Sequence, residues 1–116
     1  ESLRKVTCSK GEDLYYVLVE GRRVLGYGLL RGWDEGYVIP SLGLAIHPSA
    51  RGTGLGRFLI DFLHILAIRK GATKVRLRVN VNNQKAVDLY RAVGYILEED
   101  EKYPDHLVGL KTFGVD

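Results

Sequence analysis

Methionine is absent from the sequence, and cysteine occurs once, at Cys8. A lone cysteine forms no disulfide within the chain, and no Cys/His spacing resembles a zinc site, so no metal centre is predicted and a reducing compartment is favoured. The cytoplasm is therefore the expected location. Because the chain begins at Glu1, without an initiator methionine or anything like a signal peptide, we expect that an N-terminal segment is missing.

Long apolar runs are also lacking. Arg57, Asp61 and His64 interrupt the longest one, which leaves it short of the roughly 18–20 residues that a membrane span needs. The formal net charge is +3, and the basic residues form no continuous stripe with interleaved aromatic residues, as nucleic-acid-binding surfaces do. The sequence therefore predicts neither a membrane protein nor a nucleic-acid-binding protein. A small anionic ligand suits the charge balance better.

The composition that remains is that of one globular domain, with 116 residues, 46% of them hydrophobic and 27% charged. Alternation, turn residues and helical periodicity predict strands over 14–19, 24–30, 42–46, 74–81, 95–97 and 107–112, and helices over 55–70 and 84–93. The first two strands form a hairpin, and the strands on either side of the first helix are expected to be parallel. Apolar residues on two faces of the first helix predict that it is largely buried.

The segment 51–56 (RGTGLG) opens the first helix. A helix N-terminus presents unpaired N–H groups and a partial positive charge, and therefore stabilises an anion. Gly52, Gly54 and Gly56 let a phosphate approach the backbone, and Arg51 and Arg57 add positive charge. The spacing does not match known nucleotide loops, because position 57 is neither the third glycine of a dinucleotide fold nor part of a Gly-Lys-Ser/Thr P-loop. A glycine-rich connection without a ligand remains the alternative.

Five features between residues 44 and 95 occur in a characteristic order. They are Ile46-His47-Pro48, the segment Arg51 to Gly56, the strand Val75 to Val81, the stretch Asn83-x-x-Ala86-x-x-x-Tyr90, and the pair Gly94-Tyr95. In this order they resemble the GNAT superfamily of acyl-CoA-dependent N-acyltransferases. The resemblance covers about the second two-thirds of the chain, together with the strand that holds Gly26-Tyr27-Gly28.

This resemblance implies an α+β fold of the three-layer αβα type. Its sheet is mixed and mostly antiparallel, and a central, splayed parallel strand pair forms a V-shaped slot for CoA. Acetyl-CoA is the implied cofactor. Its pyrophosphate would lie against the backbone of Arg51, Gly52, Thr53, Gly54, Leu55 and Gly56, and its pantetheine arm against backbone groups of Ala45 and Ile46, with Asn83 at the edge of the slot.

The same resemblance makes Tyr90 the catalytic candidate, as the acid that protonates the departing thiolate. A phenol with a pKa of about 10 stays protonated at neutral pH, whereas an ordinary thiol has a pKa near 8.5. Taken alone, an inward-facing tyrosine on a helix is more often a core residue.

Other polar residues have both a functional and a structural interpretation. Asn83 also suits a helix cap. His47 suits either an amine base or a solvated loop residue, and Asp34 and Glu35 suit an acceptor site or a plain turn. The acidic run 98–101 is either a rim for a cationic substrate or a solvated hairpin, and Trp33 either lines the acceptor pocket or covers a sheet edge. Asn80 and Asn82 are expected to face solvent without a function.

The predicted function is transfer of an acetyl group from acetyl-CoA to a primary amine of a small molecule or peptide, with a homodimer left open. A non-catalytic acyl-CoA-binding sensor or module is the alternative. Residues 1–116 are expected to form a single domain that lacks the strand and two helices with which family members begin. Ser2 to Val6 would then be the tail of a lost helix.

Overall fold

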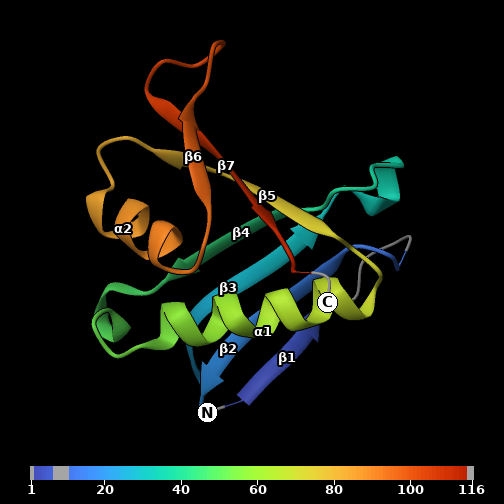
Figure 1. Cartoon of the computed structure of the whole chain (residues 1–116). Coiled ribbons are helices and arrows are strands. Elements are labelled where there is room, and N and C mark those ends of the chain that lie inside the picture. The colour runs from blue at the N-terminus through green and yellow to red at the C-terminus, as the bar shows by residue number, and fades with distance from the viewer. Residues whose placement is uncertain (1, 7–10, 115–116) are drawn as a thin grey trace.

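A computed structural model describes residues 2–6 and 11–114, so Cys8 lies outside the described residues. Within the described residues, seven strands and two α-helices follow one another (Figure 1). They are β1 (Ser2–Val6), β2 (Leu14–Glu20), β3 (Arg23–Arg31), β4 (Ser41–Ile46), α1 (Leu55–Arg69), β5 (Lys74–Asn80), α2 (Gln84–Ala92), β6 (Ile96–Glu99) and β7 (His106–Thr112). Short 3-10 turns lie at Trp33–Glu35 and Pro48–Ala50.

The strands form one mixed sheet in the order β1-β2-β3-β4-β5-β7-β6. β4 and β5 are parallel, and all other neighbours are antiparallel. The predicted parallel pair around the first helix is therefore confirmed, as is the α+β class. The crossover connection that such a parallel pair requires contains α1.

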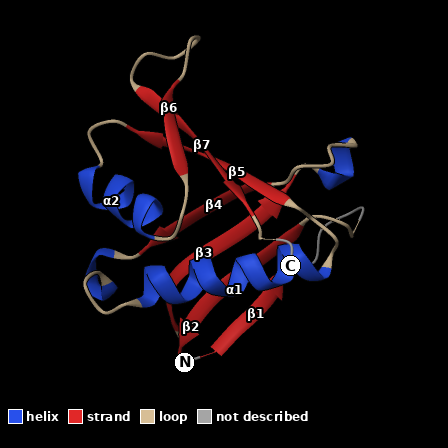
Figure 2. Ribbon diagram, viewed as in Figure 1, coloured by secondary structure: helices blue, strands red, loops and turns tan. Residues whose placement is uncertain are grey.

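Both α-helices lie on one face of the sheet (Figure 2). α1 packs closely over β3 at Gly28. A side chain at this position would not fit, because its Cβ atom would lie 2.9 Å from Leu63 Cδ1. Leu59 and Leu63 of α1 and Val75 and Leu77 of β5 belong to the same buried cluster. In the described part of the chain, the opposite face carries no α-helix, so the third layer of the expected αβα arrangement has no counterpart there.

The N-terminal residues correct one expectation. Ser2–Val6 was expected to be the end of a helix, but it is strand β1, which pairs antiparallel with β2 from Ser2–Val19 to Val6–Tyr15. The short segment is too polar for clear periodicity, and pairing along the edge of β2 determines its conformation.

The exposed face of α1 corrects a second expectation. The helix buries Leu59, Ile60, Leu63, His64 and Ala67, but Phe58, Ile65 and Ile68 are 49%, 56% and 52% exposed. Apolar residues occur on both faces of this helix, and the sheet can cover one face.

None of the helices in the described part of the chain has the length and apolar character that a transmembrane helix requires.

Candidate functional site

The segment 51–56 forms an open turn at the N-terminus of α1. Gly52 and Gly54 have φ angles of +77° and +85°, which favour glycine. A Cβ atom at either position would meet nothing within 4 Å. Among the described residues, no side chain caps α1, and the first N–H of α1 with a backbone partner is that of Phe58, which donates to Gly54 O at 3.0 Å. Within the described residues, the N–H groups of the first helical turn therefore remain available to an anion.

β4, which leads to this turn, separates from β5. Their register holds only Ser41 with Arg76, whereas the β3–β4 register runs along the whole of β4, from Arg31–Ser41 to Gly26–Ile46. Figure 1 shows the two strands diverging toward the side on which α2 lies. Their facing backbone groups lack strand partners beyond the first pair, so an extended chain placed between them can accept and donate hydrogen bonds as an added strand does.

Two hydrogen bonds show which residues of β4 face the slot. Pro40 O accepts from Arg76 N–H at 3.0 Å, on the β5 side, and His47 N–H donates to Leu25 O at 2.7 Å, on the β3 side. Since backbone groups alternate sides along a strand, Leu44 and Ile46 direct their N–H and C=O groups toward β5. The backbone groups of Ala45 point toward β3, which alters the expected contact and adds Leu44, a residue that the motif did not indicate.

Asn83 stands at the N-terminus of α2. Its side-chain oxygen accepts a hydrogen bond from Ala86 N–H at 3.3 Å, and its own N–H donates to Asn80 O at 3.0 Å. The predicted capping role is therefore confirmed. Asn80 also has a structural role that was not expected, because its side chain accepts from Asn82 N–H at 2.8 Å and tightens the turn into α2.

Tyr90 lies on the inner side of α2 and is 7% exposed. Its ring packs edge-on against Tyr95, with 5.7 Å between ring centroids, and burial raises its pKa above the usual value of a phenol. The hydroxyl makes no hydrogen bond within the described part of the chain, and it is not among the fully enclosed unpaired polar atoms. Tyr90 is thus a protonated phenol whose donor is free to act on a ligand.

A buried histidine lies behind these tyrosines. His64 of α1 is 8% exposed, and its Nε2 is 2.7 Å from the Tyr95 hydroxyl. The pKa of His64 is lowered to about 4, first by burial and then by the positive charge of Lys111, while Asp61 opposes the shift. Burial also raises the pKa of Tyr95. The pair therefore remains neutral in the folded protein at neutral pH and holds the ring against which Tyr90 packs.

The lowered pKa of His64 predicts an acid-sensitive fold. Above about pH 6.5, the imidazole is neutral in both the folded and the unfolded state. Between pH 6.5 and 4 the unfolded state binds a proton that the folded state does not, so the free energy of unfolding falls by up to about 1.4 kcal/mol per pH unit. Urea unfolding between pH 7 and 5.5 measures this slope. In His64→Gln the slope should largely vanish, and an unchanged slope would assign the effect to other groups.

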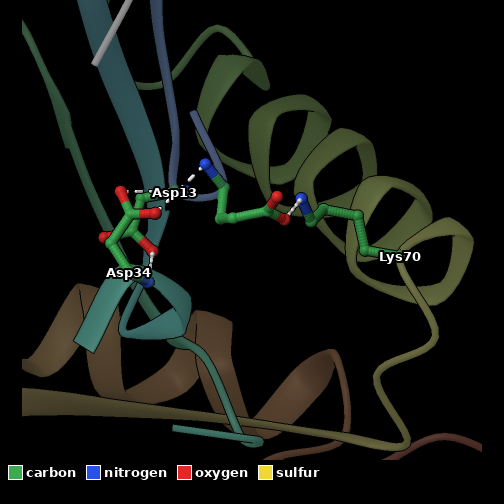
Figure 3. Close-up of polar contacts among 4 residues, drawn as sticks. Asp13, Asp34 and Lys70 are labelled. Carbon is green, nitrogen blue, oxygen red and sulfur yellow. Dashed lines mark hydrogen bonds and ion pairs between the residues drawn. The ribbon is translucent and has the colours of Figure 1, made fainter. Parts of the chain in front are cut away.

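Two of the weaker candidates have structural roles. His47 accepts from Ser49 N–H through Nδ1 at 3.1 Å and so caps the 3-10 turn after β4. Asp34 accepts from the N–H groups of Glu12 and Asp13, and the Asp13 carboxylate accepts from Asp34 N–H at 3.1 Å (Figure 3). This reciprocal pair joins the residues before β2 to the turn that follows β3. Asp34 therefore has a structural role in the turn and is not simply a solvated acid.

Lys70 covers Trp33, with Nζ 4.8 Å from the ring centroid, and forms a salt bridge with Glu12 at 3.1 Å. Trp33 also packs against the main core cluster. Trp33 is therefore a partly buried residue packed against the core and covered by Lys70. The acidic candidates line grooves on the sheet face opposite the two α-helices, which is called the helix-free side below. Glu98 and Glu99 line a groove of about 800 Å³, and Glu35 lines a neighbouring groove.

A splayed parallel strand pair with an uncapped helix N-terminus at its mouth defines a domain that can hold an extended, phosphate-bearing molecule. The sequence matches the acetyltransferase (GNAT) family over residues 2–95. The chain therefore belongs to this family.

Individual relatives agree with this assignment. Thialysine N-epsilon-acetyltransferase from Bos taurus is 35% identical over 79 residues, which are 65% of this chain and 46% of that protein. Mycothiol acetyltransferase from Jonesia denitrificans is 29% identical over 76 residues, which are 66% of this chain and 24% of that protein. The chain thus spans less than half the length of these curated relatives.

The fold matches solved structures as well. The PaiA N-acetyltransferase from Thermoplasma acidophilum, in complex with coenzyme A, superposes with a TM-score of 0.76 and 18% identity, over 87% of this chain and 61% of that one. At this identity the match shows that the fold is shared.

Proposed function

We propose that the protein transfers an acetyl group from acetyl-CoA to a primary amine of a small molecule or peptide. The observation that carries this proposal is the slot between β4 and β5, which leads from the uncapped N-terminus of α1 to the inside of the sheet. The names of the relatives support the same reaction, because each describes an acetyltransferase.

The residues of the slot suit CoA. The backbone of Arg51 to Gly56 would hold the pyrophosphate. The Arg51 N–H donates to Pro48 O, but the N–H groups of Leu55 and Gly56 have no backbone partner among the described residues, and Gly52 and Gly54 leave the approach open. Leu44 and Ile46 would pair with the amide groups of the pantetheine arm, and the Asn83 side-chain N–H₂ group would lie at the edge. When bound, acetyl-CoA supplies an activated acetyl thioester. We therefore propose that the separation of β4 from β5 forms the V-shaped slot in which CoA binds.

Two groups of the chain act on the reaction. A slot-facing N–H of β4, at Leu44 or Ile46, stabilises the negative charge that develops on the carbonyl oxygen when a neutral amine attacks the thioester carbon. The C–S bond breaks as the C–N bond forms, and the Tyr90 hydroxyl would donate its proton to the departing sulfur. The amine nitrogen loses one proton to solvent water, and Tyr90 regains a proton from solvent after the thiol leaves. Burial favours this role, since the raised pKa keeps the phenol protonated.

Release of free thiol tests the proposal. The purified protein is incubated with acetyl-CoA and a panel of primary amines, and thiol is followed with a chromogenic reagent while isothermal titration measures CoA binding. We expect amine-dependent thiol release that saturates with both substrates. Binding of CoA without thiol release from any amine would contradict catalysis and favour a non-catalytic acyl-CoA sensor, and absence of CoA binding would contradict both.

A further inference from the structure

The helix-free side of the sheet is hollowed where β4 meets β5. A groove of about 700 Å³ lies there, and the two strands contribute residues 41–43 and 76–78 to its lining. The rest of the lining comes from β3 and from the segment that follows it, through Leu29, Arg31, Gly32, Glu35, Tyr37 and Ile39. The groove therefore lies next to the Ser41–Arg76 pair, beyond which β4 and β5 separate to form the slot.

Three polar side chains form a row across this groove. The strand registers pair Arg31 of β3 with Ser41 of β4, and Ser41 with Arg76 of β5. Residues that are paired across strands present their side chains on the same face. Adjacent strands are about 4.8 Å apart, so the Cα atoms of the two arginines are about 10 Å apart with the serine between them. Two guanidinium groups and a hydroxyl can thus converge on one anionic group.

These arginines are not held in salt bridges of the described part of the chain, although Arg76 also lines the neighbouring groove with Glu98 and Glu99. The side chains of Arg31 and Arg76 are both exposed. Arg78, the third arginine of the lining, differs, because its guanidinium is 3.2 Å from Asp100 Oδ2 and lies over the Tyr103 ring at 5.1 Å. Glu35 is the acidic residue of the lining. The row therefore keeps an excess of positive charge in a partly enclosed site.

The row is too far from the proposed CoA phosphate site to serve it. Ser41 begins β4, whereas the segment 51–56 follows the other end of that strand. The six residues of β4 place about 17 Å between its two ends. An anion bound at the arginine row would therefore belong to a group other than the CoA pyrophosphate.

We propose that Arg31, Ser41 and Arg76 bind a carboxylate or phosphate group carried by the acceptor amine. This inference rests on the proposed function and names its acceptor class, an amine that bears an anionic group. Guanidinium groups are suited to it, because they bind carboxylates and phosphates through paired N–H donors.

Matched acceptors test the inference. One series compares ω-amino acids of two to six carbons with unsubstituted primary amines of the same length, and a second arm compares phosphoethanolamine with ethanolamine. Free thiol is measured for the unaltered protein, for Arg31→Gln and Arg76→Gln, and for Arg22→Gln as a control in the exposed turn between β2 and β3. We expect the best anionic acceptor to have at least a tenfold higher kcat/KM than its neutral counterpart. The arm that gives this preference identifies the anion.

The two groove substitutions should raise KM for that anionic acceptor by about tenfold, as loss of one charged hydrogen bond implies. They should leave KM for acetyl-CoA and kcat/KM for the neutral amine unchanged, and Arg22→Gln should change none of these. Equal use of anionic and neutral acceptors would overturn the inference while the proposed function stands.

Failure of the proposed function is a separate result. If no acceptor releases thiol, catalysis is contradicted, and thermal denaturation with each acceptor then tests the groove itself. Stabilisation by an anionic acceptor that disappears in Arg76→Gln would still support anion binding, and no difference from the neutral amine would overturn it.

Discussion

Tyr90→Phe should lower kcat by about 10²- to 10⁴-fold, the range that a general acid contributes. The substitution removes the free hydroxyl and keeps the ring that packs edge-on against Tyr95. The fold and the CoA site should therefore persist, and the Kd for CoA should change less than twofold. Steady-state thiol release measures the first effect, and isothermal titration with CoA measures the second.

Tyr95→Phe provides the matched control. It also removes one phenol hydroxyl from the same pair of rings, but that hydroxyl is the partner of His64 Nε2. Its loss leaves a buried nitrogen without a partner and should reduce the free energy of unfolding by about 1–3 kcal/mol. Turnover of the folded protein should remain within a few-fold of the original value. Equal turnover in Tyr90→Phe and the unaltered protein would remove Tyr90 from the mechanism.

Local signals in the sequence were sufficient for most of the fold. The helix that begins at Leu55 is present as predicted. Its end was predictable because Arg69 lies in the last turn and Gly71, with a φ of +89°, follows it. Strict alternation in 74–81 likewise predicted β5, which spans Lys74–Asn80. Ser2–Val6 was predicted wrongly, since an edge strand of five residues depends on its partner more than on its own pattern.

The candidate site was predicted less completely, for a physical reason. Motif spacing located the turn 51–56 and Tyr90, which are local features of single helices. The direction of the Leu44 backbone depends on hydrogen bonds at both ends of β4, and the row of Arg31, Ser41 and Arg76 joins three strands. Residues 45 positions apart in the sequence become neighbours through strand register, which a single sequence does not specify. His64 was missed in the same way, because its partner lies on another element.

Gly54→Ala should raise KM for acetyl-CoA by about 100-fold. Gly54 occupies the N-cap position of α1 with a φ of +85°, where an alanine costs roughly 1–2 kcal/mol. Relief of that strain would rotate the adjoining N–H groups away from the pyrophosphate, and a hydrogen bond to a charged group contributes about 1.5–3 kcal/mol. The new methyl group meets no protein atom within 4 Å, so it would occupy the space that the phosphate needs. Steady-state thiol release at varied acetyl-CoA concentration measures the change.

Gly71→Ala separates backbone strain from phosphate binding. Gly71 follows the other end of the same helix, has a φ of +89°, and also has open space where a Cβ atom would lie. Its substitution should reduce the free energy of unfolding about as much as Gly54→Ala does, with no change in KM for acetyl-CoA. The two glycines have similar φ angles, are both exposed and flank the two ends of α1. A rise in KM for acetyl-CoA that occurs only in Gly54→Ala would therefore reflect a ligand at the N-terminus of α1. An equal rise in KM for both variants would show instead that the turn acts through the stability of α1, and would contradict a phosphate site at residues 51–56.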